Sequence, residues 1–167
     1  MRQYSERMSR VTGSAIRQIM KLMADPNIIS LGGGNPAPES FPVDKIREIT
    51  DQLLREKPVQ MLQYGITIGY EPLRQAVLEH LFRPKGIQAE LENIITFTGS
   101  TQGIYLVLDM FIDPGVPILV ESPTFLGTLN VMKKLGAKII PVEMDEDGLD
   151  VEDLERKIKQ HHPRLLY

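Results

Sequence analysis

The chain has 167 residues, of which 42% are hydrophobic and 25% charged, and its formal net charge is −3. These values are typical of a globular protein with one domain core, and the mixed charges offer no basic surface for nucleic acid. Cysteine is absent, which excludes disulfides and thiolate metal sites. No apolar run is long enough to cross a bilayer, and no secretory signal is recognisable, so we expect a cytoplasmic protein with no membrane partner.

The first ninety residues predict helices joined by connections rich in glycine and proline. Helices are expected at 14–24 and at about 43–56, where apolar residues recur at helical spacing. A third helix is expected to begin at Pro72, because proline suits the first turn. Its buried stripe is predicted to consist of Leu73, Ala76, Val77 and Leu81.

After residue 90 the pattern changes to alternating strands and helices. Strands are predicted at 94–98, 117–121 and 138–142, and helices near Gly103, Phe125 and Val151. This alternation is typical of an α/β fold with a doubly wound parallel sheet.

The last predicted helix has a well-marked start. Asp150 is the expected N-cap, Asp153 follows three residues later, and Leu149 and Leu154 have the spacing of a hydrophobic staple. Residues 164–167 then open a further strand, in which the sequence stops. A parallel sheet needs helices on both faces, so we expect this chain to be a piece of a longer protein.

The stretch 94–103 reads as a buried strand that runs through Gly99 into a helix. Ser100 or Thr101 is expected to cap this helix, whose first N–H groups lack partners within the helix. A phosphate could accept hydrogen bonds from these N–H groups and from the two hydroxyls. The alternative is an ordinary helix cap that binds nothing.

Other polar clusters do not favour a metal or a dinucleotide. The segment 144–148, MDEDG, lacks the ligand spacing of a calcium loop and is predicted to be a turn. His161 and His162 are adjacent, so on a helix they point in different directions. No GxGxxG follows a predicted strand, and no metal ligands are assigned.

Four motifs, in this order, carry a resemblance to a known family: IISLGGGNPAPESFP, LQYGITIGYEPLR, ITFTGSTQG and VESPTFLGTL. The chain resembles the N-terminal part of a fold type I pyridoxal-phosphate aminotransferase, in particular the 2-aminoadipate/kynurenine aminotransferase subgroup, from about Ile16 onward. The resemblance implies that residues 1–42 form an N-terminal helix and a substrate-side loop. Residues 43–167 would then be an incomplete large domain that binds pyridoxal 5'-phosphate.

The resemblance also implies roles for cofactor-binding residues. Ser100, Thr101 and Gln102 match the loop that holds the cofactor phosphate, although many family members have Gln where Thr101 stands. Phe125 matches the aromatic residue that stacks on the pyridine ring. Many relatives have Tyr at that position, whose hydroxyl Phe125 lacks. A plain core aromatic is the alternative for Phe125.

Further residues match family positions at the subunit interface and the substrate pocket. Tyr64 matches a tyrosine that reaches the phosphate of the neighbouring subunit, which implies a homodimer, and Tyr70 is the local competitor for this role. Gly34 matches a residue beside the substrate carboxylate, and Arg17 matches an arginine that frames the substrate pocket. A tight turn and a solvated helical arginine are the respective alternatives.

No catalytic residue is assigned, because the resemblance places the lysine that holds the cofactor covalently beyond Tyr167. The function implied is transfer of an amino group between an amino acid and a 2-oxo acid through pyridoxal phosphate. Two alternatives stay open. One is a lyase or decarboxylase of the same fold, and the other is the effector-sensing domain of a transcription regulator.

Overall fold

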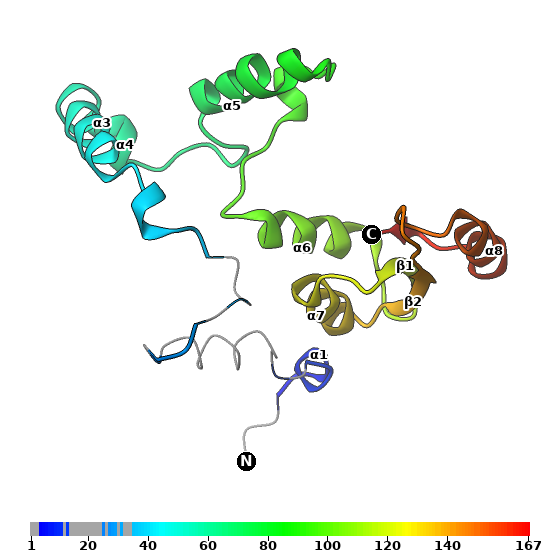
Figure 1. Ribbon diagram of the computed structural model, residues 1–167. Helices are drawn as coiled ribbons and strands as arrows, with labels where there is room; N and C mark the ends of the chain where they lie inside the picture. Colours follow the sequence, from blue (N-terminus) through cyan, green and yellow to red (C-terminus); the bar gives the residue numbers. More distant parts are fainter. Residues whose placement is uncertain (1–3, 12, 14–24, 26, 30, 32–34) are drawn as a thin grey trace. The chain divides into compact units, whose positions relative to one another are not determined.

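A computed structural model describes residues 4–11, 13, 25, 27–29, 31 and 35–167. Contacts divide the chain into two compact units, one formed by Met1–Gly33 with Thr98–Tyr167 and the other by Gly34–Phe97 (Figure 1). The helix expected at 14–24, and with it Arg17, lies outside the described residues, as does Gly34. The division predicted at residues 42 and 43 stays a prediction.

The unit that contains Thr98–Tyr167 is built on a parallel sheet. Its strands are β1 (Pro117–Ser122), β2 (Lys138–Glu143) and β3 (Leu165–Leu166), in the spatial order β2-β1-β3. Ile118 of β1 pairs with Ile139 of β2 and with Leu165 of β3, and both pairings are parallel. The structure therefore confirms the two predicted strands at 117–121 and 138–142, the strand that opens at the C-terminus, and their parallel direction.

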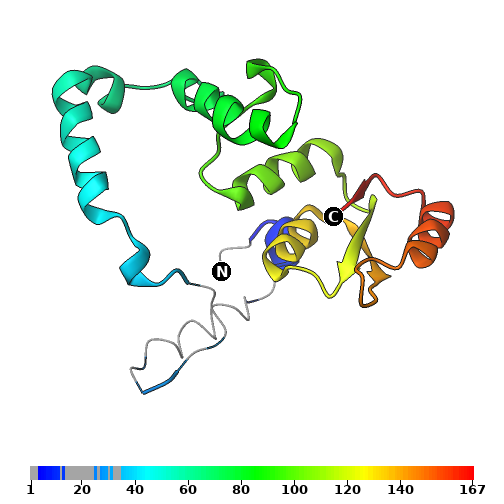
Figure 2. The ribbon, with the colours of Figure 1, turned by 45° about the horizontal axis from the view of Figure 1, so that its top comes forward.

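Helices cover both faces of this sheet (Figures 1 and 2). Leu108 of α6 (Ser100–Phe111) and Met132 of α7 (Leu126–Leu135) pack against Ile118 and Val120 on one face. Leu119, whose side chain points to the opposite face, packs with Ile140 and Val142 under α8 (Val151–His161). Short α1 (Glu6–Ser9) contacts α7. The expected doubly wound arrangement is thus confirmed.

The other unit, Gly34–Phe97, is mainly helical. Its elements are η1 (Pro38–Ser40), α3 (Val43–Glu56), α4 (Pro58–Leu62), α5 (Glu71–Val77), a π-helical turn η2 (Leu78–Phe82), η3 (Arg83–Lys85) and η4 (Leu91–Asn93). The helix predicted at 43–56 and the helix predicted to begin at Pro72 are both present, with Pro72 in the first turn of α5.

The buried stripe predicted for the third helix is wrong in part. Leu73 and Leu81 are about half exposed, whereas Arg74 and Leu78 are buried. Arg74 is buried because its guanidinium has backbone partners: Nε donates to the carbonyl of Ile94 across 2.8 Å, and Nη2 donates to the carbonyl of Leu91. A buried cation is tolerated when its donors are paired, and apolar spacing does not reveal this.

The strand predicted at 94–98 is also wrong, because this segment forms no strand with any described residue. Ile94 donates its N–H to Leu91, and the N–H of Thr96 donates to the carbonyl of Ile68 across 3.1 Å. A β-strand needs a neighbouring strand that accepts and donates along its length. The apolar pattern predicts extended backbone, but it cannot supply that neighbour.

No helix among the described residues is long and apolar enough to span a membrane.

Candidate functional site

Helix α6 begins at the predicted loop, but its cap differs from the expected one. Gly99 is the N-cap, with φ 100° and ψ 160°, and Ser100 and Thr101 are the first two helical residues. Neither side chain caps the helix. Glycine adopts this backbone conformation without steric cost, so the turn places the cap one residue earlier than predicted.

The side chain of Gln102 stabilises this turn. Its Oε1 accepts from the N–H of Thr98 across 2.6 Å, and the backbone N–H of Gln102 donates to the carbonyl of Gly99 across 3.1 Å. Within the described part of the chain, the N–H groups of Ser100 and Thr101 have no acceptor, and the first turn holds no acidic residue. Two backbone donors and two hydroxyls at the positive end of a helix dipole are suited to an anion.

Phe125 occupies the corresponding position of the next helix. It is the N-cap residue of α7, three residues after the end of β1, and its side chain is 55% exposed. Helix α7 connects β1 to the parallel strand β2, so it runs back from the end of β1 toward the start of β2. The start of α7, with Phe125, therefore lies at the carboxyl edge of the sheet, where ligands of open α/β sheets bind.

Two hydroxyls beside Phe125 are buried. Thr128, which is 2% exposed, donates from Oγ1 to the hydroxyl of Tyr167 across 2.9 Å. The hydroxyl of Thr124 is buried and has no hydrogen-bond partner among the described residues. The bond from Thr128 joins the first turn of α7 to the residue after β3.

Tyr64 and Tyr70 belong to the other unit. Both line a mostly apolar cavity of about 540 Å³ between α3, α4 and the start of α5. Tyr64 is 98% exposed and Tyr70 is 50% exposed. Tyr64 is thus almost unpacked within the described residues, whereas Tyr70 is partly packed. Ser100 belongs to the first unit, so the roles predicted for the two tyrosines at the cofactor phosphate stay predictions.

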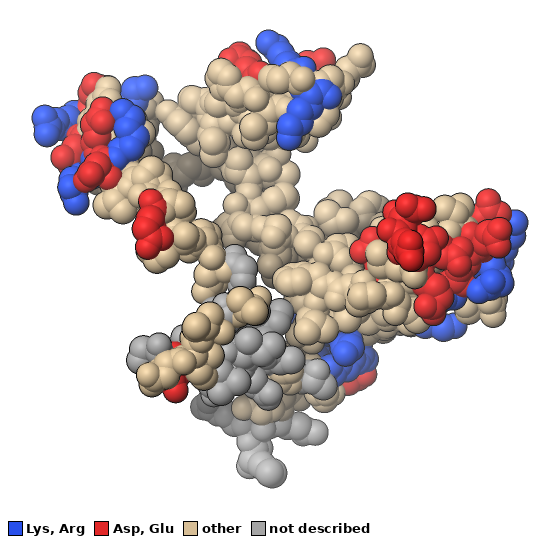
Figure 3. Space-filling view, viewed as in Figure 1, with Lys and Arg blue, Asp and Glu red and all other residues tan. Residues whose placement is uncertain are grey.

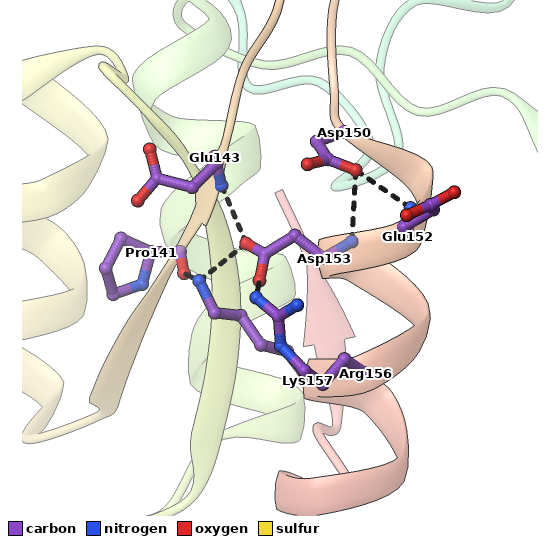
Figure 4. A network of polar contacts seen from close by, with 7 residues as sticks. All are labelled: Pro141, Glu143, Asp150, Glu152, Asp153, Arg156 and Lys157. Carbon is purple, nitrogen blue, oxygen red and sulfur yellow. Dashed lines mark hydrogen bonds and ion pairs between the residues drawn. The ribbon is translucent and has the colours of Figure 1, made fainter.

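A polar network fixes α8 to β2 (Figure 4). Asp150 caps α8 as predicted, accepting from the N–H groups of Glu152 and Asp153. Asp153, 1% exposed, accepts from the N–H of Glu143 across 2.9 Å and from Lys157 Nζ across 2.6 Å, and it pairs with Arg156.

The carboxyl group of Asp153 therefore serves the fold. The hydrogen bond from Lys157, followed by that from the backbone of Glu143, lowers its pKa below the ordinary value. The N–H of Asp150 donates to the carbonyl of Glu143 across 3.0 Å, which adds a second link between α8 and β2. Leu149 and Leu154 pack on the same core cluster, as their staple spacing predicted.

Acidic side chains gather over α8 and the turn before it (Figure 3). As predicted, 144–148 is a turn: Asp145 accepts from the N–H groups of Asp147 and Gly148 through Oδ1, at 2.8 and 3.0 Å. Within the described ranges, no three His, Cys, Asp or Glu side chains are arranged to hold a metal ion.

The fold defines a class of protein: an α/β unit in which helices cover both faces of a parallel sheet. The family model for aminotransferase class I and II matches residues 26–166. The chain belongs to this family.

Individual relatives agree with this assignment. The chain is 39% identical over 157 residues to aromatic-amino-acid aminotransferase 1 of Thermococcus litoralis, covering 94% of this chain and 38% of the relative. It is 40% identical over 158 residues to 2-aminoadipate transaminase of Thermus thermophilus, covering 95% of this chain and 38% of the relative.

A solved structure matches the fold in detail. LysN, an α-aminoadipate aminotransferase of Thermus thermophilus complexed with N-(5'-phosphopyridoxyl)-L-leucine, superposes with a TM-score of 0.85 at 35% identity. The match covers 98% of this chain and 39% of that structure. The chain thus spans about two fifths of the length of these relatives, which supports the expectation that it is part of a longer protein.

Proposed function

We propose that this chain is the N-terminal part of an aminotransferase that moves an amino group between an amino acid and a 2-oxo acid with pyridoxal phosphate. The observation that carries the proposal is the start of α6 in a chain of this family. There, the N–H groups of Ser100 and Thr101 lack acceptors among the described residues. No observation favours the lyase, decarboxylase or regulator alternatives over it.

The residues at the starts of α6 and α7 fit the cofactor. Ser100 and Thr101 would hold the phosphate through backbone N–H groups and hydroxyls, and Gln102 keeps the turn in shape through Thr98. The space beside Gly99 is open, since a β-carbon built on this residue would meet no atom within 4 Å. A phosphate could therefore approach the turn at Gly99. Phe125 would stack on the pyridine ring with its exposed surface.

The remaining assignments concern the substrate and the partner subunit. Arg17 and Gly34 are proposed to contact the substrate, and Tyr64 is proposed to reach the phosphate of the second subunit of a homodimer. The near-complete exposure of Tyr64 supports a role outside its own unit. The cofactor supplies an electron sink for cleavage of bonds at the amino-acid α-carbon, while these residues bind and orient. A cytoplasmic location is part of the proposal.

The test uses the full-length protein that contains this chain. Purified with pyridoxal phosphate, it should convert 2-oxoglutarate to glutamate with an amino donor such as 2-aminoadipate. A double variant, Ser100→Ala with Thr101→Ala, should bind pyridoxal phosphate at least tenfold more weakly. The physical reason is that hydrogen bonds to a charged group each contribute about 1.5–3 kcal/mol.

Thr50→Ala is the matched control, because the Thr50 hydroxyl only donates to the carbonyl of Ile46 on exposed α3. Its cofactor affinity should equal that of the parent. Cofactor binding by the full-length protein without any amino transfer would contradict the proposed activity. Equal cofactor affinities of the parent and the double variant would contradict the proposed phosphate site at Ser100 and Thr101.

A further inference from the structure

The ring of Phe125 lies against the backbone of Gly127, two residues further along the chain. A β-carbon built on Gly127 would stand 2.5 Å from Cε1 of the ring, 2.8 Å from Cζ and 3.3 Å from Cδ1. Nonbonded carbon atoms prefer separations of about 3.5–4.0 Å. The ring therefore occupies space that any residue other than glycine would fill.

Among the described residues, nothing but this ring explains glycine at position 127. Gly127 lies in the first turn of α7, where glycine is a poor helix former compared with alanine. Its backbone is not among those with a positive φ that favours glycine. The close approach of the ring is the remaining reason for the missing side chain.

The surrounding backbone cannot easily yield to a larger residue. Thr128, the next residue, is 2% exposed and bonded to the hydroxyl of Tyr167. The ring of Phe125, in contrast, is at the end of a side chain that is 55% exposed and can rotate into solvent. A methyl group on residue 127 would therefore displace the ring and leave the helix in place.

We infer that Gly127 is a positioning residue, which sets the orientation of the Phe125 ring for stacking on a flat heteroaromatic ligand. The inference rests on the proposed function, in which that ligand is the pyridine ring of pyridoxal phosphate. The ring lies against the backbone of Gly127, and about half of the residue stays exposed to a ligand. Gly127 contributes to binding only through Phe125 and needs no contact of its own with the ligand.

The test is a double-mutant cycle in the full-length protein with Gly127→Ala, Phe125→Ala and the combination. Gly127→Ala should weaken the binding of pyridoxal phosphate to the apoprotein about two- to tenfold, the range expected for loss of aromatic stacking. The visible circular dichroism of the bound cofactor should change as well. The Tm of the apoprotein should stay the same or rise, because alanine favours the helix.

In the Phe125→Ala background, Gly127→Ala should have no further effect on cofactor affinity. Equal effects of Gly127→Ala in both backgrounds would overturn the inference, as would unchanged affinity and circular dichroism when Phe125→Ala alone weakens binding. A lowered apoprotein Tm would also overturn it, since the substitution would then act on the fold. If the parent does not bind pyridoxal phosphate at all, the proposed function itself fails.

Discussion

The hydroxyl of Thr128 donates to the hydroxyl of Tyr167 across 2.9 Å, and it joins α7 to the residue after β3 over a separation of 39 residues. Thr128 is almost fully buried, whereas Tyr167 is 37% exposed. A buried hydroxyl is costly when it has no partner, so this bond specifies where the end of β3 lies relative to α7.

We therefore expect Tyr167→Phe to destabilise the full-length protein by about 1–3 kcal/mol, the cost of leaving a buried polar group unpaired. The measurement is the free energy of unfolding from urea titration. Adding Thr128→Val, which removes the second partner at nearly constant shape, should recover most of the loss. If the double variant is less stable than Tyr167→Phe alone, the hydrogen bond is not the cause.

A second prediction concerns the contact between Gly69 and Thr96. The φ of Gly69 is 105°, and a β-carbon there would stand 2.0 Å from the Thr96 hydroxyl oxygen. Gly69→Ala should therefore lower the free energy of unfolding by more than about 1 kcal/mol, because the backbone conformation and the space both exclude alanine.

Gly65→Ala is the matched control for this experiment. A β-carbon on Gly65 would meet no atom within 4 Å, and Gly65 does not have a positive φ. The free energy of unfolding of this variant should equal that of the parent within about 0.5 kcal/mol. Similar losses for the two variants would show that the loop before α5 does not depend on the contact with Thr96.

These contacts show which features the sequence could predict and which it could not. The Asp150 cap and the strand at 117–121 were predictable because each depends on local spacing. The burial of Arg74 was not, since it depends on carbonyl groups 17 and 20 residues away. The absence of a strand at 94–98 likewise depends on a neighbouring strand, which no local pattern specifies.

In the candidate site, too, local features were predictable from the sequence and features that depend on the surrounding structure were not. The sequence predicted that Ser100 and Thr101 begin a helix after a glycine, and the turn and helix are present. It did not predict Gly99 as the cap, because the φ of a glycine is set by the loop that it closes. The positioning role that we infer for Gly127 was also not predicted, because its sequence signal is no more than a glycine inside a predicted helix.

A third prediction concerns the acid stability of the network around Asp153. Its pKa is lowered in the folded state, chiefly by the hydrogen bond from Lys157, so the folded protein favours the ionised form. This stabilisation is complete above about pH 5 and is lost as the pH falls through the lowered pKa of the folded state. Asp153→Asn should be less stable at pH 7 and should lose less stability on acidification.

The measurement compares the Tm of the parent and the variant between pH 7 and pH 3. The difference between the two should shrink as the pH falls. Glu146→Gln is the control, because Glu146 is exposed in the turn before α8, and its Tm should follow that of the parent. A constant difference between Asp153→Asn and the parent would mean that ionisation of this carboxyl group does not stabilise the fold.

The last prediction is that residues 1–167, expressed alone, do not catalyse amino transfer even when the full-length protein does. The resemblance places the lysine that moves the α-proton in the remainder of the enzyme, and a positioned acid-base group contributes about 10²–10⁴-fold to the rate. The isolated chain also leaves apolar side chains exposed, among them Ile46, Val59 and Leu62. It should therefore associate or precipitate, because large exposed apolar patches are rare in monomers.

The isolated chain and the full-length protein are both assayed with pyridoxal phosphate, 2-aminoadipate and 2-oxoglutarate, and their sizes are measured by gel filtration. Turnover by the isolated chain at the rate of the full-length protein would show that residues 1–167 already contain the catalytic groups.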